Sequence, residues 1–357
     1  MTGRAPRPSV LFLDKVFLKR VSWPLRGVEL FNLHLLRDLV RLGYPVTLIA
    51  EASWREAVLE FMGTDRPEVL WFAAPGPHAL AIPLAGWRLR RHRFDRLLVG
   101  NVGNGLLPLL KHLHRRRAFH RAVLVAHREA APRFVQAWRT WPGAVVAVNE
   151  KIAAPFRTPA GGPVCVDYGI FNSERYHPPA QRPVAPVRFV VLGALDNAWK
   201  GADTAQAAFA GLTPAQRAAA ELHLASYRQP PAVGERVVAH PWLAAEAIPD
   251  LLREMQVMIC PSRDEVVMRE TFSQAMVQGM LSGLPVLAND LPILTEKLDQ
   301  GGGLVFRTPA ELTGLMSRLL ADAPLRERLG GEARATALAR YVWDTARFAR
   351  TYLEPAT

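Results

Sequence analysis

Cysteines and long apolar runs are both scarce in this sequence. Only two cysteines, Cys165 and Cys260, occur among 357 residues, and each lies in an apolar, strand-like segment. We therefore expect both to be buried free thiols in a reducing compartment. The N-terminal segment lacks the apolar core of a secretory signal, so we expect none. Residues 69–87, a long stretch without a charged side chain, contain prolines and glycines that argue against a membrane-spanning helix.

Negative charge is scarce in the first half of the chain. Residues 1–172 carry 25 Lys and Arg against 12 Asp and Glu, whereas residues 173–357 carry 19 against 20. This asymmetry accounts for the net charge of +12 and bears on partners rather than on the fold. One alternative that the charge raises is a nucleic-acid-binding protein. Against it, the chain has no RRM or zinc-finger motif, and its basic residues do not alternate with stacking aromatics.

The order of apolar segments indicates two α/β domains. The chain length suits two domains of roughly 150–180 residues each. Residues 10–13 and 46–49 are apolar, strand-like runs, and the amphipathic segment 30–42 between them is typical of a helix. This β-loop-α-β order opens a parallel α/β domain. A second such opening starts with the strand-like run 188–193.

Residues 270–290 are the stretch around which the second half is organised. Apolar residues recur at helical spacing, so we predict a helix over 270–281. Gly283 supplies the left-handed conformation that ends such a helix, and Pro285 begins a short strand. The prediction places Glu270 at the helix N-terminus, where the macrodipole favours an anion. Gln278 follows two to three turns further along the same helix.

This stretch resembles the Glu-x7-Glu signature of retaining glycosyltransferases with the GT-B fold, especially glycosyltransferase family 4. Glu270 falls on the first Glu of that signature, Gln278 on the second, and Gly283 and Pro285 on its closing Gly-x-Pro-Val. On this stretch alone, the alternative is an ordinary helix–turn–strand unit with a capping Glu. The sequence departs from the family at two points, because the second carboxylate is an amide and the loop before Glu270 is longer than usual.

The resemblance covers nearly the whole chain, firmly in the second half and loosely in the first. Residues 193–201 are similar to the family's Gly-Arg-x5-Lys-Gly segment, in which Lys200 matches and Ala194 replaces the Arg. The resemblance implies GT-B architecture, in which two Rossmann-like parallel-sheet domains face each other across a cleft. We place these domains at residues 1–172 and 173–341, with a C-terminal helix in 342–357 crossing back onto the first.

The resemblance also implies roles for individual side chains. Lys200 would stabilise the leaving diphosphate, Glu270 would contact the sugar, and Gln278 would bind the ribose hydroxyls. His127 follows a strand and would reach the sugar from the first domain, although a purely structural histidine is the alternative. The expected catalytic residues are Lys200, Glu270 and His127. The expected donor-binding residues are Gly27, Gly193, Arg263, Arg269, Phe272, Ser273, Gln278 and Trp242, with Arg263 or Arg269 replacing the missing cation.

These roles predict a retaining transfer of a sugar from a nucleoside-diphosphate sugar to an acceptor hydroxyl. UDP or GDP is the expected nucleotide, and the acceptor is a glycan, a lipid-linked molecule or a small glycoside. No Asp-x-Asp motif occurs, so we expect no cofactor and no obligatory metal ion. Two alternatives share the fold. One is a nucleotide-sugar epimerase or hydrolase, and the other is a nucleotide-sugar-binding protein with degenerate catalysis, motivated by Ala194 and Gln278.

Two groups of basic residues, within 88–96 and 111–121, raise a hypothesis about partners. Such a face would meet an anionic acceptor or an anionic membrane surface. Solvated faces of ordinary surface helices are the alternative. We accordingly expect a cytoplasmic protein of glycan biosynthesis, bound peripherally to the inner face of a membrane, with no nucleic-acid partner.

Overall fold

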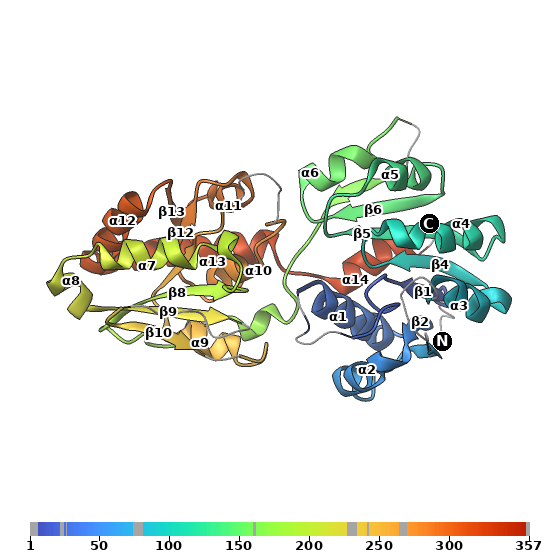
Figure 1. The fold of residues 1–357 in the computed structure, drawn as a ribbon, viewed down its shortest axis with the longest axis horizontal. Helices are drawn as coiled ribbons and strands as arrows, with labels where there is room; N and C mark the ends of the chain where they lie inside the picture. Colours follow the sequence, from blue (N-terminus) through green and yellow to red (C-terminus); the bar gives the residue numbers. More distant parts are fainter. Residues whose placement is uncertain are drawn as a thin grey trace, which may run out of the picture. The chain divides into compact units, whose positions relative to one another are not determined.

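The chain folds into two compact units, each built on one parallel sheet (Figure 1). The first unit comprises residues 1–168 and 344–357, and the second comprises residues 169–343. The prediction from the sequence put these boundaries at 172/173 and 341/342. The computed structural model describes residues 6–21, 25, 27–73, 81–159, 162–226, 234–240, 243–263 and 270–354.

The sheet of the first unit has the strand order β3-β2-β1-β4-β5-β6-β7. Neighbouring strands are parallel throughout, and the inner ones are almost entirely buried, because helices cover both faces of such a sheet. The strands are β1 (Val10–Leu13), β2 (Val46–Glu51), β3 (Glu68–Phe72), β4 (Phe94–Val99), β5 (Phe119–Ala126), β6 (Gly143–Ala147) and β7 (Val164–Val166).

The helices of the first unit include the C-terminal segment of the chain. They are α1 (Gly27–Arg41), α2 (Arg55–Met62), α3 (Ala81–Arg88), α4 (Leu107–Arg115), α5 (Pro132–Trp138), α6 (Glu150–Ala153), α14 (Thr345–Phe348) and the π-helix Ala349–Leu353. Arg96 on β4 is buried, and its Nε donates to the Leu353 carbonyl at 2.6 Å. This hydrogen bond attaches the end of the chain to the sheet of the first unit.

The sheet of the second unit has the strand order β10-β9-β8-β11-β12-β13, again parallel. The strands are β8 (Val187–Gly193), β9 (Ala220–Ser226), β10 (Val237–His240), β11 (Val257–Cys260), β12 (Val286–Asn289) and β13 (Gly303–Phe306). The helices are α7 (Ala202–Ala210), α8 (Pro214–Ala218), α9 (Ile248–Glu254), α10 (Gln274–Leu281), α11 (Pro292–Thr295), α12 (Pro309–Ala321) and α13 (Ala323–Arg340).

Alternate residues of β11 show how helices cover both faces of this sheet. Val257 and Ile259 belong to a buried cluster that includes Phe209 of α7 and Met316 of α12. Met258 points to the opposite face, where a Cβ on Gly279 of α10 would lie 3.0 Å from its Cγ. Successive side chains of a strand point to opposite faces, so the second unit is a three-layer helix–sheet–helix structure.

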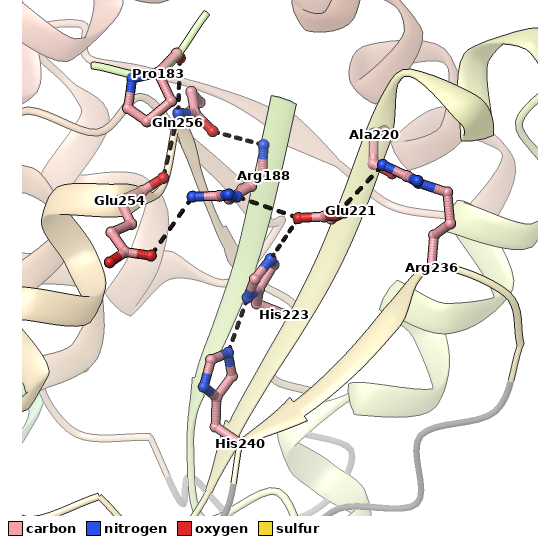
Figure 2. A network of polar contacts seen from close by, with 9 residues as sticks. All are labelled: Pro183, Arg188, Ala220, Glu221, His223, Arg236, His240, Glu254 and Gln256. Atoms are coloured by element: carbon pink, nitrogen blue, oxygen red, sulfur yellow. Dashed lines mark hydrogen bonds and ion pairs between the residues drawn. The ribbon is translucent and has the colours of Figure 1, made fainter. Parts of the chain in front are cut away.

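A network of polar side chains joins the neighbouring strands β8, β9 and β10 of the second sheet (Figure 2). His223 Nε2 is 3.2 Å from Glu221 Oε2, and His223 Nδ1 is 2.8 Å from His240 Nε2. An ionised carboxylate only accepts, so the proton of His223 sits on Nε2 and His240 donates to Nδ1. Arg188 Nε, on β8, also donates to Glu221, at 3.2 Å. The network thus satisfies polar groups on partly buried strands, which explains these histidines without a catalytic role.

The two cysteines are both free, but they differ in burial. Cys260 is buried, as predicted, and burial raises the pKa of its thiol to about 12. Cys165 is only half-buried on β7, so the prediction was wrong for its burial. The reason is that β7 is an edge strand, and Val166 beside Cys165 is 45% exposed. Among the residues that the structure describes, no helix combines the length and apolarity needed to cross a membrane.

Candidate functional site

The loops that follow β8 and β11 meet at the carboxyl edge of the second sheet. The two strands are neighbours, with Val257 beside Phe189 and Met258 beside Val190. Because the strands are parallel, the segments after Gly193 and Cys260 leave the sheet side by side. This is the edge at which open α/β sheets bind ligands. The loop after β8 carries Lys200, and the segment after β11 leads to Glu270.

Lys200 and Glu270 form a largely buried ion pair. The Nζ atom of Lys200 lies 2.5 Å from Glu270 Oε2, and the two side chains are 16% and 8% exposed. Ser262 Oγ donates to the same carboxylate oxygen at 3.2 Å, and the backbone N–H of Ser273 donates to Oε1 at 3.0 Å. Three donors therefore hold the carboxylate, while the ammonium keeps two further protons for another acceptor.

The helix of the predicted signature begins later than expected. We predicted a helix over 270–281, but α10 starts at Gln274, so Glu270 precedes the helix instead of opening it. Ser273 has φ +61°, a left-handed conformation that cannot lie inside a right-handed helix. This turn brings the Ser273 N–H onto Glu270. The helix ends as predicted, since Gly283 has φ +70°.

Glycines let the two loops approach closely. Gly201 has φ +72°, and a Cβ there would lie 2.1 Å from the carbonyl oxygen of Pro261. No other residue fits this contact without displacing the loop after β11. Gly193 has φ +150°, and a Cβ on it would lie 3.7 Å from Cε of Lys200. Gly193 lies beside the Lys200 side chain, and Gly201 directly follows Lys200 in the loop.

Arg263 contacts the loop that carries Lys200, but its guanidinium is already paired with the carboxylate of Asp203. Its guanidinium Nη2 donates to Asp203 at 3.0 Å and to the Ala198 carbonyl at 2.7 Å. Its backbone N–H donates to the Trp199 carbonyl at 2.7 Å. Arg263 thus tethers the loop around Lys200 in the described structure. Its role as a replacement for the missing cation stays a prediction.

Gln278 and Phe272 lie on either side of the Ser273 turn. Gln278 is half-buried on α10, and its Nε2 donates to the Tyr176 hydroxyl at 2.9 Å. Phe272 is buried, with its ring edge-on to Tyr341 at a centroid distance of 5.8 Å. The amide oxygen of Gln278 is the acceptor that the predicted ribose contact would use.

Comparison with protein families identifies the domain that contains the Lys200–Glu270 pair. Residues 186–322 match the family model described as Glycosyl transferases group 1. The second unit carries a group 1 glycosyltransferase domain. The match spans β8 to the end of α12 and so includes Lys200, Glu270 and Gln278. A comparison of the sequence with curated proteins finds no match.

Solved structures of low sequence identity share the fold of the whole chain. Sucrose-phosphate synthase from Thermosynechococcus elongatus superposes with a TM-score of 0.73 at 16% identity, covering 96% of this chain and 98% of its own. Anabaena HepE in complex with UDP and glucose gives 0.68 at 17% identity, with coverage of 96% and 98%. WaaG, a glycosyltransferase involved in lipopolysaccharide biosynthesis, gives 0.67 at 14% identity, with coverage of 97% and 100%. The chain has the GT-B architecture, with two Rossmann-like parallel sheets, as predicted.

The group 1 domain contains a buried lysine that sequence reasoning missed. The Lys297 side chain is 1% exposed, and its Nζ donates to the Ile293 carbonyl at 2.8 Å. The ammonium lies 5.1 Å from the Phe272 ring centroid and 5.4 Å from that of Tyr341. Burial lowers the pKa of Lys297, and the carboxylates of Glu296 and Glu270 oppose this shift. No motif marks it, because in sequence it reads as an ordinary surface lysine of a polar helix.

The predicted residues of the first unit lie apart from the group 1 domain in the chain. His127 follows β5 and is buried between aromatic rings, at centroid distances of 4.9 Å from Phe31 and 5.2 Å from Tyr168. Burial lowers the pKa of His127 to about 3, although a backbone hydrogen bond with Gly100 opposes the shift. The imidazole is therefore neutral at physiological pH. Gly27 is the first residue of α1, which begins three residues earlier than the helical segment expected over 30–42.

A buried carboxylate at the carboxyl edge of the first sheet was also missed. Asp14 follows β1, accepts from the Val16 N–H at 2.8 Å and from Asn32 Nδ2 at 2.6 Å, and is 2% exposed. Burial raises the pKa of Asp14 to about 6. A single Asp after a strand carries no sequence signal. Two predicted donor-binding residues, Arg269 and Trp242, lie outside the described residues. Within the described ranges, no three His, Cys, Asp or Glu side chains form a metal-binding group.

Proposed function

We propose that the protein is a retaining glycosyltransferase that moves a sugar from a nucleoside-diphosphate sugar to an acceptor hydroxyl. The observation that carries the proposal is the Lys200–Glu270 pair at the carboxyl edge of the group 1 domain. HepE, which shares the fold, has structures in complex with UDP and with UDP-glucose. UDP or GDP is accordingly the nucleotide we propose for this chain. Retention of configuration rests on the resemblance to family 4.

Each residue of the pair has a distinct part in the proposed reaction. The bond from the sugar to the diphosphate breaks, so negative charge grows on the departing oxygen and needs a preorganised cation. Lys200 supplies it, because its ammonium is partly exposed and has two protons not used by Glu270. Glu270 orients that ammonium and contacts the sugar. The roles of His127 and Gly27 toward the same donor stay predictions.

The alternatives that share the fold make different products. A hydrolase would release free sugar from the donor, and an epimerase would return a changed nucleotide sugar. A degenerate binding protein would do neither. The intact ion pair favours catalysis, because a buried charged pair is costly to keep where it has no role. We further propose a cytoplasmic location and an acceptor in glycan biosynthesis.

A thermal-shift panel is the first test of the proposal. UDP-, GDP-, ADP- and TDP-sugars are compared, and one nucleotide series should raise Tm in proportion to ln(1 + [L]/Kd). At a ligand concentration of about 1,000 Kd the stabilisation is about 4 kcal/mol. The preferred donor is then incubated with candidate acceptors, and product stereochemistry is read by NMR. No shift with any donor, or an inverted product, would overturn the corresponding part of the proposal.

Restoring the carboxylate at position 278 is expected to tighten donor binding. Charge-assisted hydrogen bonds contribute roughly 1.5–3 kcal/mol and neutral ones about 0.5–1.5. Gln278→Glu should therefore lower the donor KM by up to about tenfold, with little change in kcat, because the ribose contact is alike in ground and transition states. Gln216→Glu is the matched control, since it adds the same charge on α8 and preserves a capping box. An equal KM change in both variants would argue against the ribose contact.

A further inference from the structure

A basic segment of the first unit is almost free of compensating charge. Between residues 69 and 128 the sequence has 11 Lys and Arg but a single carboxylate, Asp95. That carboxylate is already engaged, because it accepts from the backbone N–H and the hydroxyl of Ser9 at 2.7 and 2.8 Å. His120 Nδ1 lies 3.9 Å from Asp95 Oδ1. The segment therefore has a positive electrostatic potential.

Tertiary contacts join two groups of arginines that lie apart in the sequence. Arg93 Nη1 donates to the carbonyls of Arg116 and Arg117, at 2.5 and 2.7 Å. The Arg116 guanidinium in turn donates to the carbonyl of Arg90. Helices α3 and α4, which lead into these groups, pack against each other (Figure 1). The groups therefore form one continuous surface instead of two separate helix faces.

We call this the basic surface and define it by its exposed members. They are Trp87, Arg88, Arg90, Arg91, Arg93, Lys111, Arg115, Arg117 and Arg121. Within the part of the chain that the structure describes, none of these cations pairs with a carboxylate. Arg96, which the sequence grouped with them, is buried and bound to Leu353, so it is not part of this surface.

An exposed tryptophan lies among these cations. Trp87 is 54% exposed and is the one aromatic among the large exposed apolar side chains of the described residues. The Cζ of Arg90 lies 4.0 Å from its ring centroid, and that of Arg88 lies 5.6 Å away. Tryptophan together with basic residues is typical of protein surfaces that lie at the level of the membrane headgroups.

The basic surface lies at the opposite end of the sheet from the ligand-binding edge. Arg93 immediately precedes β4, and Arg115 and Arg117 precede β5. His127 comes directly after the other end of β5. A strand of this length, eight residues, spans about 26 Å at roughly 3.3 Å per residue. The arginines are therefore too far from the carboxyl edge of their own sheet to bind a ligand held there, which argues against the anionic-acceptor version of the hypothesis.

We propose that the basic surface docks the protein on the anionic headgroups of a membrane, with Trp87 inserted between them. The absence of carboxylates and the adjacent tryptophan fit a lipid surface. Surfaces that bind single-stranded nucleic acid add a series of stacking aromatics to the positive charge, whereas this surface has one aromatic, Trp87. Each cation near an anionic surface increases partitioning by about fivefold at moderate salt. This docking is independent of the glycosyl-transfer chemistry.

Co-sedimentation of the full chain with vesicles tests the proposal. The vesicles contain phosphatidylcholine alone or with about one third phosphatidylserine, at salt concentrations of about 0.1 and about 0.5 M. The protein should pellet with the anionic vesicles at low salt, dissociate at high salt and ignore the neutral vesicles. Trp87→Ala should reduce binding to the anionic vesicles at low salt. Recovery in the supernatant with both vesicle types would overturn the proposal.

A matched pair of variants shows whether the surface or only the net charge matters. The first variant replaces Arg88, Arg91, Arg115 and Arg121 by Gln. The control replaces Arg20, Arg133, Arg318 and Arg350, which are exposed elsewhere, by Gln. Partitioning should fall by at least about a hundredfold in the first and far less in the control, with Tm unchanged in both. An equal fall in both variants, or salt-sensitive binding to an oligonucleotide without vesicle binding, would contradict membrane docking.

Discussion

Replacing Lys200 by alanine is expected to lower kcat by roughly a hundredfold or more, with a smaller effect on the donor KM. Negative charge on the diphosphate grows as the sugar leaves, so a cation placed beside it matters most in the transition state. Lys200 is the more exposed member of the ion pair, at 16% against 8%, and so the one better placed to meet the phosphate. Initial-rate kinetics with the preferred donor measures both constants.

The same substitution has a second effect that must be separated from the first. Without Lys200, the Glu270 carboxylate is left nearly buried, and among the described residues its remaining donors are Ser262 and Ser273. Breaking a buried pair by removing one partner costs about 3–5 kcal/mol. Lys200→Ala should therefore unfold more easily, and low activity alone would not prove a catalytic role.

A double variant resolves the two effects. Lys200→Met combined with Glu270→Gln removes both charges and keeps similar volumes, so denaturant unfolding should show most of the stability restored. Its kcat should stay low, because the cation is still missing. Lys200→Arg keeps the charge and should fall between the wild type and Lys200→Ala. Wild-type kcat in a folded Lys200→Ala protein would place the diphosphate elsewhere.

Replacing Glu270 by alanine is expected to reduce kcat by roughly a hundredfold as well, through a different cause. Glu270 fixes the Lys200 ammonium and is proposed to contact the sugar, so its loss removes orientation as well as a contact. Glu270→Gln keeps the shape and an acceptor for the Ser273 N–H, and should retain more activity than alanine. Single-turnover rates with saturating donor separate this effect from donor binding.

Ser262→Ala is the matched control for Glu270. It removes one donor to the carboxylate at 3.2 Å and leaves the ion pair intact, so its cost should be about 1 kcal/mol in stability with a minor loss of rate. If Glu270→Ala and Lys200→Ala were both as active as the wild type, the glycosyl-transfer site would have to lie elsewhere. If Ser262→Ala were as damaging as Glu270→Ala, the carboxylate would act through loop structure alone.

Local pattern in the sequence determined most of the fold and the identity of the central residues. The apolar runs at β1, β2 and β8 predict parallel strands, because strands buried on both faces must be apolar. Gly283 predicts the end of α10 through its left-handed conformation. Glu270, Gln278 and Lys200 follow from the resemblance to the family's signatures, which are read along the chain. These features depend on neighbours within a few residues, which the sequence displays directly.

Only the tertiary structure decided which of these residues act together. Lys200 and Glu270 meet because β8 and β11 are adjacent strands, and that adjacency depends on the topology of the whole sheet. Ser273 interrupts the predicted helix because its backbone is left-handed, with φ +61°, and helical periodicity does not encode that conformation. Lys297 is buried, although as a lysine it reads as exposed, because a carbonyl and two aromatic rings surround its ammonium. Burial and pairing at these positions depend on contacts between distant segments, and such contacts exist only in the folded chain.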